Sequence, residues 1–331
     1  MTRDGRLRAA ILGCGRIAGA FAEPGGRPTT HAQVLGGDGA RAFRLAAVSD
    51  VEAARAEAFA TRWGADSVCA PDELGAAGLD LVVVATPDAA HAADILRLLA
   101  GPRPPRLVVV EKPLCVLAGE LAALQAAIAT QPRTTVVVNH PRRFDAAHRE
   151  VRELIASRRF GPVIGVHWVY YGGWLHNGVH LVDTLRMLLG GEITAIAVRP
   201  GWADRAGDPC LDGDFRCAAS PQVRILVESH PQSAFQLFES EIRMQDGRVR
   251  LLDFGNQILV DAVRVNAIGE RELKDARPIG SDAAPTSMQA LHDLAARFLT
   301  QGDDEIVACC GVAEAAATMR TLFDAKMQLR S

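Results

Sequence analysis

The chain has 331 residues and a formal net charge of −3; 49% of its residues are hydrophobic and 23% are charged. This balance is typical of a globular protein in water, and it excludes a strongly basic surface for nucleic acid or for an anionic membrane. The length is sufficient for two domains, and no apolar run is long enough to cross a membrane.

The cysteines and the N-terminal stretch indicate a reducing compartment. Seven cysteines are scattered without a C-x-x-C pair, which is typical of a cytoplasmic protein. The basic residues before the first apolar run resemble a signal peptide, but the run is short and breaks into Gly-Cys-Gly-Arg without a cleavage site. We therefore expect a cytoplasmic location, and no cysteine that acts as a metal ligand or nucleophile.

The first apolar run, 9–12, ends in a glycine-rich turn. The pattern Gly13-x-Gly15-x-x-Ala18 after a short strand is typical of a tight turn that enters a helix. Gly15 lets a pyrophosphate approach the backbone, and the N–H groups at the helix start favour an anion. A tight turn that binds nothing is the alternative. The predicted cofactor-binding residues of this turn are Gly13, Cys14, Gly15, Arg16 and Ile17.

Asp50 stands at the end of the second predicted strand, 43–48. An acid at this place accepts hydrogen bonds from the adenosine ribose and repels a 2′-phosphate, so it favours NAD over NADP. The stretch of sequence between the glycines and Asp50 is longer than usual, because a loop is inserted around 23–29. The alternative role is capping of a helix that starts at Val51, and the two roles are compatible.

Strands alternate with helices five times in the first 140 residues, which predicts a doubly wound parallel sheet. Functional groups of such sheets gather beyond the carboxyl ends of the strands. The predicted strands are 9–12, 43–48, 79–85, 107–110 and 135–138. Beside the glycine turn and Asp50, the residues that we expect to bind the cofactor at this edge are Thr86, Pro87, His91, Glu111, Lys112 and Asn139.

The pattern changes after residue 145. A helix over 146–157 and a strand over 161–170 precede a loop and a helix that ends at Gly190. β-rich segments then run from 193 to 266, and helices over about 287–300 and 311–328 follow. We expect an α/β chain with a Rossmann domain over 1–140 and an α+β domain over 141–331 that carries a large, mostly antiparallel open sheet.

These motifs together resemble the Gfo/Idh/MocA family, which is named after glucose–fructose oxidoreductase, inositol dehydrogenase and a rhizopine-catabolism protein. The resemblance covers essentially the whole chain. It implies an NAD(P)-dependent oxidoreductase that acts on CH–OH groups of sugars, sugar nucleotides or polyols, and a homodimer or homotetramer formed through the open sheet. The matching segments are ILGCGRIA at 11–18, VSD at 48–50, ATPDAAH at 85–91, EKPL at 111–114, NHPRRFD at 139–145 and NGVHLVDTLRMLLG at 177–190.

The same resemblance assigns catalytic roles. Lys112 would contact the substrate hydroxyl and the nicotinamide ribose, and Pro113 would follow it through a cis peptide bond. His180 would act as the acid/base, with Asp183 in support one turn later. The chemistry agrees, because alcohol oxidation needs a base near pH 7 and a lysine polarises the oxygen. We expect the ammonium and the imidazole to converge on one alcohol oxygen.

His176 stands where relatives of inositol dehydrogenase commonly carry an aspartate. Either Lys112 and His180 manage the proton alone, or His176 contacts the substrate and suits an anionic group. Asn177 before the glycine is typical of members tied to sugar-nucleotide metabolism. The two histidines have no third ligand, and Gly178 lies between them, so we expect no metal.

Three more side chains and two other functions stay open. Tyr171 and Trp174 either line a sugar pocket or pack in the core. Arg142 either holds a phosphate or carboxylate, or forms an exposed ion pair. Because the aspartate is absent, a non-redox NAD(H)-binding sensor or regulatory protein is a second possible function. A redox-neutral enzyme with tightly bound NAD is the third possibility.

Overall fold

The computed structural model describes residues 5–23, 25–36, 41–203, 205–281 and 283–329. The chain divides into two compact units. The first holds residues up to 144 together with 285–316, and the second holds 145–284 and the residues from 317 on. The division therefore differs from the expected linear boundary at residue 140, because a segment from late in the chain returns to the first unit.

The first unit is built on a five-stranded sheet with the order β2-β1-β3-β4-β5 and parallel neighbours throughout. Runs of Val, Leu and Ile form these strands because both faces of the sheet are buried. The strand order reverses at β1, which lies between β2 and β3, and this confirms the doubly wound sheet. The strands are β1 Leu7–Leu12, β2 Phe43–Ser49, β3 Leu81–Val84, β4 Leu107–Glu111 and β5 Thr135–Asn139.

The helical segments of this unit follow the expected order, with five differences. The helix after the glycine turn is a single π-helical turn, and η2, η3, α5 and α9 were not predicted. The segments are η1 Arg16–Ala20, α1 His31–Leu35, α2 Ala53–Trp63, η2 Pro71–Ala76, η3 Asp88–Ala90, α3 His91–Ala100, α4 Ala118–Ala129, α5 Pro141–Phe144, α8 Ser287–Gln301 and α9 Glu305–Cys310.

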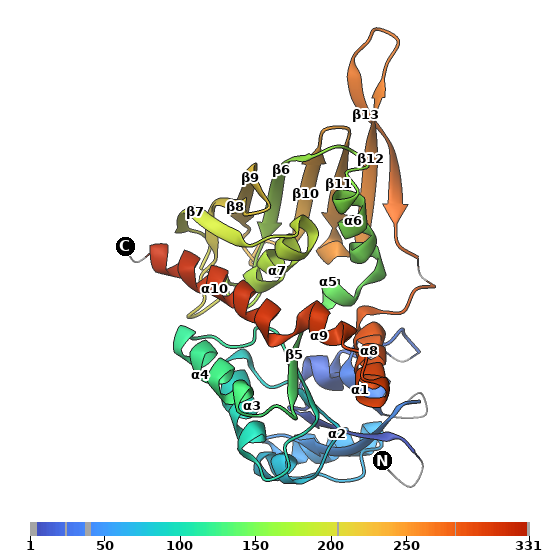
Figure 1. The fold of residues 1–331 in the computed structure, drawn as a ribbon, viewed down its shortest axis with the longest axis vertical. Coiled ribbons are helices and arrows are strands. Elements are labelled where there is room, and N and C mark those ends of the chain that lie inside the picture. The colour runs from blue at the N-terminus through green and yellow to red at the C-terminus, as the bar shows by residue number, and fades with distance from the viewer. Residues whose placement is uncertain (1–4, 24, 37–40, 204, 282, 330–331) are drawn as a thin grey trace. The chain divides into compact units, whose positions relative to one another are not determined.

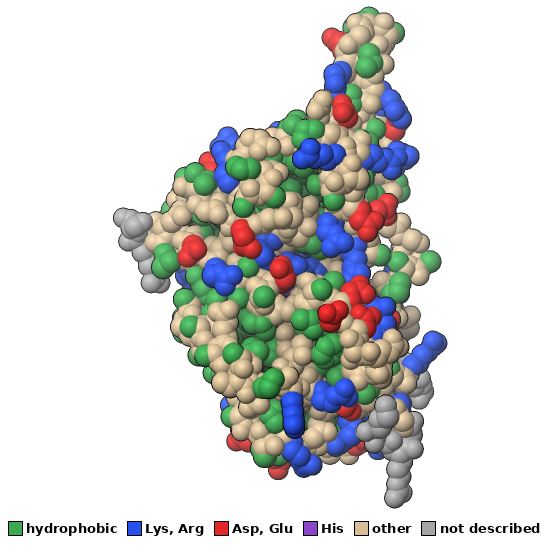
Figure 2. Space-filling model, in the orientation of Figure 1, with side chains coloured by type: hydrophobic (Ala, Val, Ile, Leu, Met, Phe, Trp, Pro, Cys, Tyr) green, Lys and Arg blue, Asp and Glu red, His purple; other side chains and the backbone are tan. Residues whose placement is uncertain are grey.

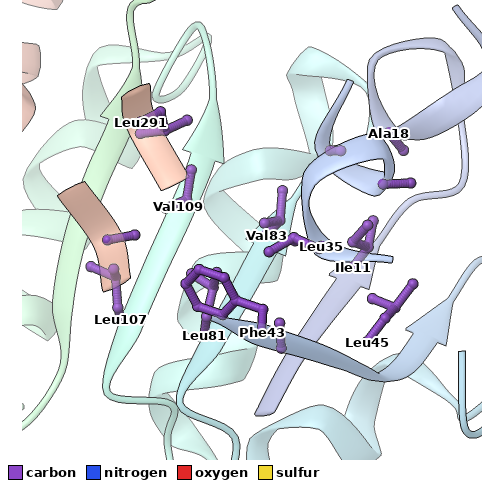
Figure 3. Close-up of a cluster of buried hydrophobic side chains, with 14 of the residues drawn as sticks. Ile11, Ala18, Leu35, Phe43, Leu45, Leu81, Val83, Leu107, Val109 and Leu291 are labelled. Carbon is purple, nitrogen blue, oxygen red and sulfur yellow. The ribbon is translucent and has the colours of Figure 1, made fainter. Parts of the chain in front are cut away.

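The core of the first unit explains why residues 285–316 belong to it. Figure 3 shows side chains of the sheet, among them Ile11, Val83 and Val109, in one cluster with Leu291 of α8. Met288 and Leu294 of α8 are buried in the same cluster. A fully buried Leu contributes about 2 kcal/mol, so α8 is an integral part of this core.

The second unit is an eight-stranded sheet with the order β13-β12-β11-β10-β6-β9-β8-β7, in which only the β6–β9 pair is parallel. Figure 1 shows α6 Ala146–Ala156 and α7 Gly178–Leu189 on one face of this sheet, together with α10 Val312–Gln328, whose residues from 317 on belong to this unit. The strands are β6 Val163–Tyr170, β7 Ile193–Pro200, β8 Leu211–Cys217, β9 Ser220–Ser229, β10 Glu239–Met244, β11 Gly247–Leu252, β12 Gln257–Val265 and β13 Arg271–Ile279. The large, mostly antiparallel sheet is therefore confirmed.

The strand β13 was not predicted. It pairs with β12 and forms a hairpin that extends beyond the other strands of its sheet in Figure 1. Its residues are mostly exposed, and Figure 2 shows side chains of both charges on this hairpin. Among the residues that the structure describes, no helix combines the length and apolar character that a membrane span needs.

Candidate active site

The two glycines of the first turn stand in different surroundings. Gly13 has φ +91°, and a Cβ on it would lie 2.7 Å from backbone atoms of Ala85 and Thr86. The turn thus packs directly on the carboxyl end of β3. A Cβ on Gly15 would meet no heavy atom within 4 Å. Packing among the described residues therefore does not require glycine at position 15, and the open backbone there fits a bound pyrophosphate.

The start of η1 supplies amide groups beside this open backbone. The N–H groups of Gly19 and Ala20 both bond to the carbonyl oxygen of Gly15, at 3.2 and 3.3 Å. The amides of Arg16, Ile17 and Ala18 precede these bonds and so have no carbonyl within the helix to bond to. Such amides suit an anion, and the turn therefore fits a dinucleotide phosphate.

Asp50 ties the end of β2 to the glycine turn. Its Oδ2 accepts a hydrogen bond from the Cys14 amide at 2.8 Å, and its Oδ1 accepts one from the Glu52 amide at 2.9 Å. Arg55 pairs with the same carboxylate at 3.1 Å. The helix α2 begins at Ala53 rather than at Val51, so Asp50 is not its N-cap residue. The carboxylate is only 4% exposed, and it organises the turn whatever it does toward a cofactor.

Cys14 itself is unsuited to act as a nucleophile. Burial, together with the charge of Asp50, raises the pKa of its thiol to about 12. The thiol is therefore protonated at neutral pH and packs in the core of the first unit.

His91 braces the end of β3 against the loop after β4. Its Nε2 lies 2.8 Å from the Thr86 carbonyl oxygen, and its Nδ1 lies 2.6 Å from the Pro113 carbonyl oxygen. The residue is 1% exposed, so both ring nitrogens are used inside the protein. Thr86 donates its hydroxyl to Asp94 at 2.7 Å, whereas Pro87 is exposed.

Glu111 and Asn139 are hydrogen-bonded to each other in the interior of the first unit. Glu111 Oε1 accepts hydrogen bonds from Asn139 Nδ2 at 2.7 Å and from His31 Nε2 at 2.9 Å. Burial acts to raise the pKa of Glu111, but the hydrogen bonds from His31 and Asn139 and the charge of Lys112 hold it below its ordinary value. This buried carboxylate directly precedes Lys112, which is half-buried and is followed by a cis bond to Pro113, as expected. Arg142 is half-buried in α5.

In the second unit, His180 lies in the first turn of α7 beside aromatic rings. Its ring meets that of Phe238 edge-on, with 6.3 Å between centroids. Phe238 stacks on Phe254 at 6.0 Å, and Tyr171 contacts Phe254 edge-on at 5.7 Å. Phe238 and Phe254 were missed by the sequence reasoning. The only signal was the turn at Phe254-Gly255-Asn256, and Phe254 does adopt a left-handed φ of +59° there.

The loop before α7 is held by a carboxylate that was also missed. Asp208 accepts hydrogen bonds from the Leu175 and His176 amides, each at 2.9 Å. His176 and Asn177 are half-buried. Burial raises the pKa of Tyr171, and a hydrogen bond with Asn177 acts in the opposite direction. The loop is therefore an ordered element that presents His176 and Asn177 next to His180.

Trp174 and Asp183 both face α10. Trp174 is 0% exposed and donates its Nε1–H to the Leu322 carbonyl oxygen at 2.9 Å, so it packs in the core and does not line a pocket. Asp183 is also buried and accepts a hydrogen bond from the Thr318 hydroxyl at 3.2 Å. Asp183 thus anchors the helix that carries His180.

The predicted site residues are shared between the two units. Lys112 belongs to the first unit and His180 to the second, so their convergence on one oxygen stays a prediction. Within the described ranges, no three His, Cys, Asp or Glu side chains are grouped so that they could hold a metal ion.

Comparison with known proteins agrees with the fold of the first unit. Residues 7–140 match the model of the GFO_IDH_MocA oxidoreductase family with its NAD-binding Rossmann fold. An inositol 2-dehydrogenase from Saccharopolyspora erythraea is 25% identical over 338 aligned residues, which cover 97% of this chain and 94% of that protein.

Solved structures share the fold over nearly the whole chain. A 3-ketoreductase from Actinomadura kijaniata, in complex with TDP-benzene and NADP, has a TM-score of 0.76, 16% identity and 98% coverage of both chains. An oxidoreductase from Agrobacterium radiobacter, in complex with NAD+, L-tartaric acid and magnesium, has a TM-score of 0.72 and 16% identity, and 98% of this chain and 97% of that chain are covered. The chain therefore matches the GFO_IDH_MocA oxidoreductase family over its NAD-binding Rossmann region, residues 7–140, and it shares the fold of these solved structures over nearly its whole length.

Proposed function

We propose that the enzyme transfers a hydride between a nicotinamide cofactor and a hydroxyl-bearing carbon of a cyclic polyol or sugar. The observation that carries this proposal is the place of Lys112. It follows the buried, hydrogen-bonded Glu111 at the carboxyl end of β4, in the sheet whose β1 turn leaves the Gly15 backbone open. A bound nicotinamide supplies the hydride acceptor or donor.

Lys112 and His180 have separate roles in the proposal. The ammonium of Lys112 donates a hydrogen bond to the reacting oxygen and stabilises the negative charge that develops on it. The imidazole of His180 takes the hydroxyl proton during oxidation and returns it during reduction. Asp183 supports His180 by anchoring α7 to Thr318.

The surroundings of His180 support a ring-shaped substrate with many hydroxyl groups. The half-buried Phe254, next to Phe238, offers an apolar surface to the C–H face of a sugar or cyclitol. His176 and Asn177 offer polar groups from the ordered loop held by Asp208. A histidine in place of a carboxylate favours a substrate with an anionic part, which Arg142 would also suit. The relative from S. erythraea, an inositol 2-dehydrogenase, supports the cyclitol choice.

We further propose NAD as the cofactor, a cytoplasmic location, and a homodimer or homotetramer. Asp50 is fixed at the end of β2, where a carboxylate accepts the ribose hydroxyls, and Arg55 is already paired with it. The helix-free face of the large sheet carries charges of both signs in close pairs, such as Arg248 with Glu241 at 2.9 Å and with Asp261 at 3.0 Å. Such a face is complementary to a second copy of itself.

The test uses steady-state kinetics with NAD and NADP and a panel of inositols, aldoses and nucleotide sugars. Lys112→Met and His180→Asn should each lower kcat by about 10²–10⁴-fold while NAD affinity stays near that of the wild type. Lys274→Met, which removes an exposed lysine of β13, is the matched control and should leave kcat unchanged.

Full activity of both variants would refute the assigned roles. A wild-type protein that binds NAD(H) but oxidises no member of the panel would instead favour the non-redox sensor. Tighter binding of NADP than of NAD would overturn the cofactor preference.

A further inference from the structure

Three buried histidine and carboxylate side chains form a hydrogen-bonded chain that ends next to Lys112. The Nε2 of His292, on α8, lies 2.9 Å from the Nδ1 of His31, on α1. The Nε2 of His31 lies 2.9 Å from Glu111 Oε1, at the end of β4. His31 is 0% exposed and His292 is 1% exposed, so water does not replace these contacts.

The protons of this chain are fixed by its partners. Ionised Glu111 is an acceptor only, so His31 donates from Nε2 and its Nδ1 is left to accept from His292 Nε2–H. Burial holds the pKa of His292 well below its ordinary value, so His292 is neutral. Its Nδ1 has no hydrogen-bond partner among the described residues, which agrees with the Nε2–H tautomer. Every N–H in the chain therefore points toward the carboxylate.

From this geometry we propose that His31 and His292 are positioning residues, which hold Glu111 ionised and oriented beside Lys112. The inference rests on the proposed function of Lys112. The groups that face Glu111 are His31 from α1, Asn139 from β5 and the adjoining Lys112, while His292 and the Phe43 ring lie behind His31. Without the histidine chain, only Asn139 and Lys112 oppose the effect of burial on this carboxyl group, and burial favours the neutral acid. Lys112 then loses the negative charge beside it.

The proposal predicts a graded series of variants. His31→Leu removes the donor to Glu111, and the acidic limb of the kcat/KM profile should move upward by about one pH unit, which is roughly a fivefold loss at the former midpoint. His292→Leu should give a smaller shift in the same direction, because it removes the group that fixes the tautomer of His31. His292→Gln places an amide N–H near the position of Nε2 and should restore the wild-type profile.

The acidic limb of the kcat/KM profile distinguishes a positioning role of the two histidines from a role in packing alone. A residue that only fills space changes the amount of folded enzyme and leaves the pH profile of the folded fraction in place. The proposal is overturned if the active fraction, counted by NAD binding, shows the wild-type acid limb in both leucine variants.

A second measurement decides the proposal without turnover. The ¹³C resonance of the Glu111 carboxyl group should report an ionised group throughout the neutral range in the wild type, and protonation at higher pH in His292→Leu. An unchanged titration would refute the chain even in an active enzyme. Conversely, a shifted titration in a protein that oxidises no polyol would support the chain while the proposed function fails.

Discussion

At the scale of single residues, two glycines that look equivalent in the sequence pattern have different roles. Gly13 is required by the fold, because its φ is positive and the backbone of Ala85 occupies the place of a side chain. Gly15 meets no such neighbour. The motif therefore contains one glycine that the fold requires and one that a bound ligand requires. Replacing each glycine with alanine distinguishes the two roles.

We expect Gly13→Ala to lower the free energy of unfolding by about 1–3 kcal/mol, because of strain and the clash with β3. Gly15→Ala should leave that free energy within about 0.5 kcal/mol of the wild type and weaken NAD binding by about tenfold or more. Urea unfolding and NAD titration on both variants measure the two effects. Equal losses of stability in both variants would contradict the assignment.

The same scale shows where sequence reasoning about the site stops. Strand periodicity placed Asp50, Glu111 and Asn139 at the carboxyl edge of the sheet, as the structure has them. It did not reveal their partners. His31 lies 80 positions before Glu111 and His292 lies 181 positions after it, so no local pattern connects them. The partners of His91 were hidden for the same reason, since they are two backbone carbonyl groups.

At the scale of elements, α6 begins with a cap that depends on pH. Asp145 accepts hydrogen bonds from the His148 amide at 2.9 Å and from His148 Nδ1 at 2.7 Å. Burial acts to raise the pKa of Asp145, but the hydrogen bonds and the charge of His148 hold it below its ordinary value. The cap therefore stabilises the fold above the unfolded-state pKa of about 3.9, and this contribution disappears as the pH falls through the lower folded-state value.

Asp145→Asn keeps the side-chain oxygen that accepts from the backbone but removes the charge. We expect it to lower the free energy of unfolding at pH 7 by less than about 1 kcal/mol, because the carboxylate is about a third exposed and solvent screens it. The difference from the wild type should vanish at low pH. Chemical unfolding from pH 3 to pH 7 measures it, and a difference that grows on acidification would disprove the sign.

Elements were predictable where burial leaves a pattern. The strands β8 and β11 alternate buried and half-buried residues, so their type is evident from sequence. The strand β13 is exposed along almost its whole length and is held through its pairing with β12. Its polar sequence thus carries no period of two. The short α9 and the π-helical turn η1 could not be predicted for a related reason, because a single turn shows no helical period.

At the scale of the whole molecule, the first unit is completed by residues that are distant in sequence. Leu291, Leu294 and Leu299 of α8 are buried among the side chains of the parallel sheet and its helices. Gly311, the residue after α9, also reaches the sheet, through a bridge to Val137 of β5. The predicted boundary at residue 140 did not include this later segment in the first unit. The helical pattern over 287–300 does not indicate which of the two sheets the helix covers.

We therefore expect that a fragment of residues 1–144 does not fold by itself. It would expose the apolar surface that α8 covers, so it should bind a hydrophobic dye and lack a cooperative unfolding transition. Addition of a peptide that spans 285–316 should restore the transition. Near-ultraviolet circular dichroism and thermal unfolding measure both, and a cooperative transition of the fragment alone would count against the division.

This return of the chain also sets an order of events during synthesis. The ribosome releases the five strands of the nucleotide-binding sheet early, yet α8 leaves it only after the whole of residues 145–284. Domains usually mature from the N-terminal end, one after another. Here the region that is translated first waits with part of its sheet uncovered until α8 has been released.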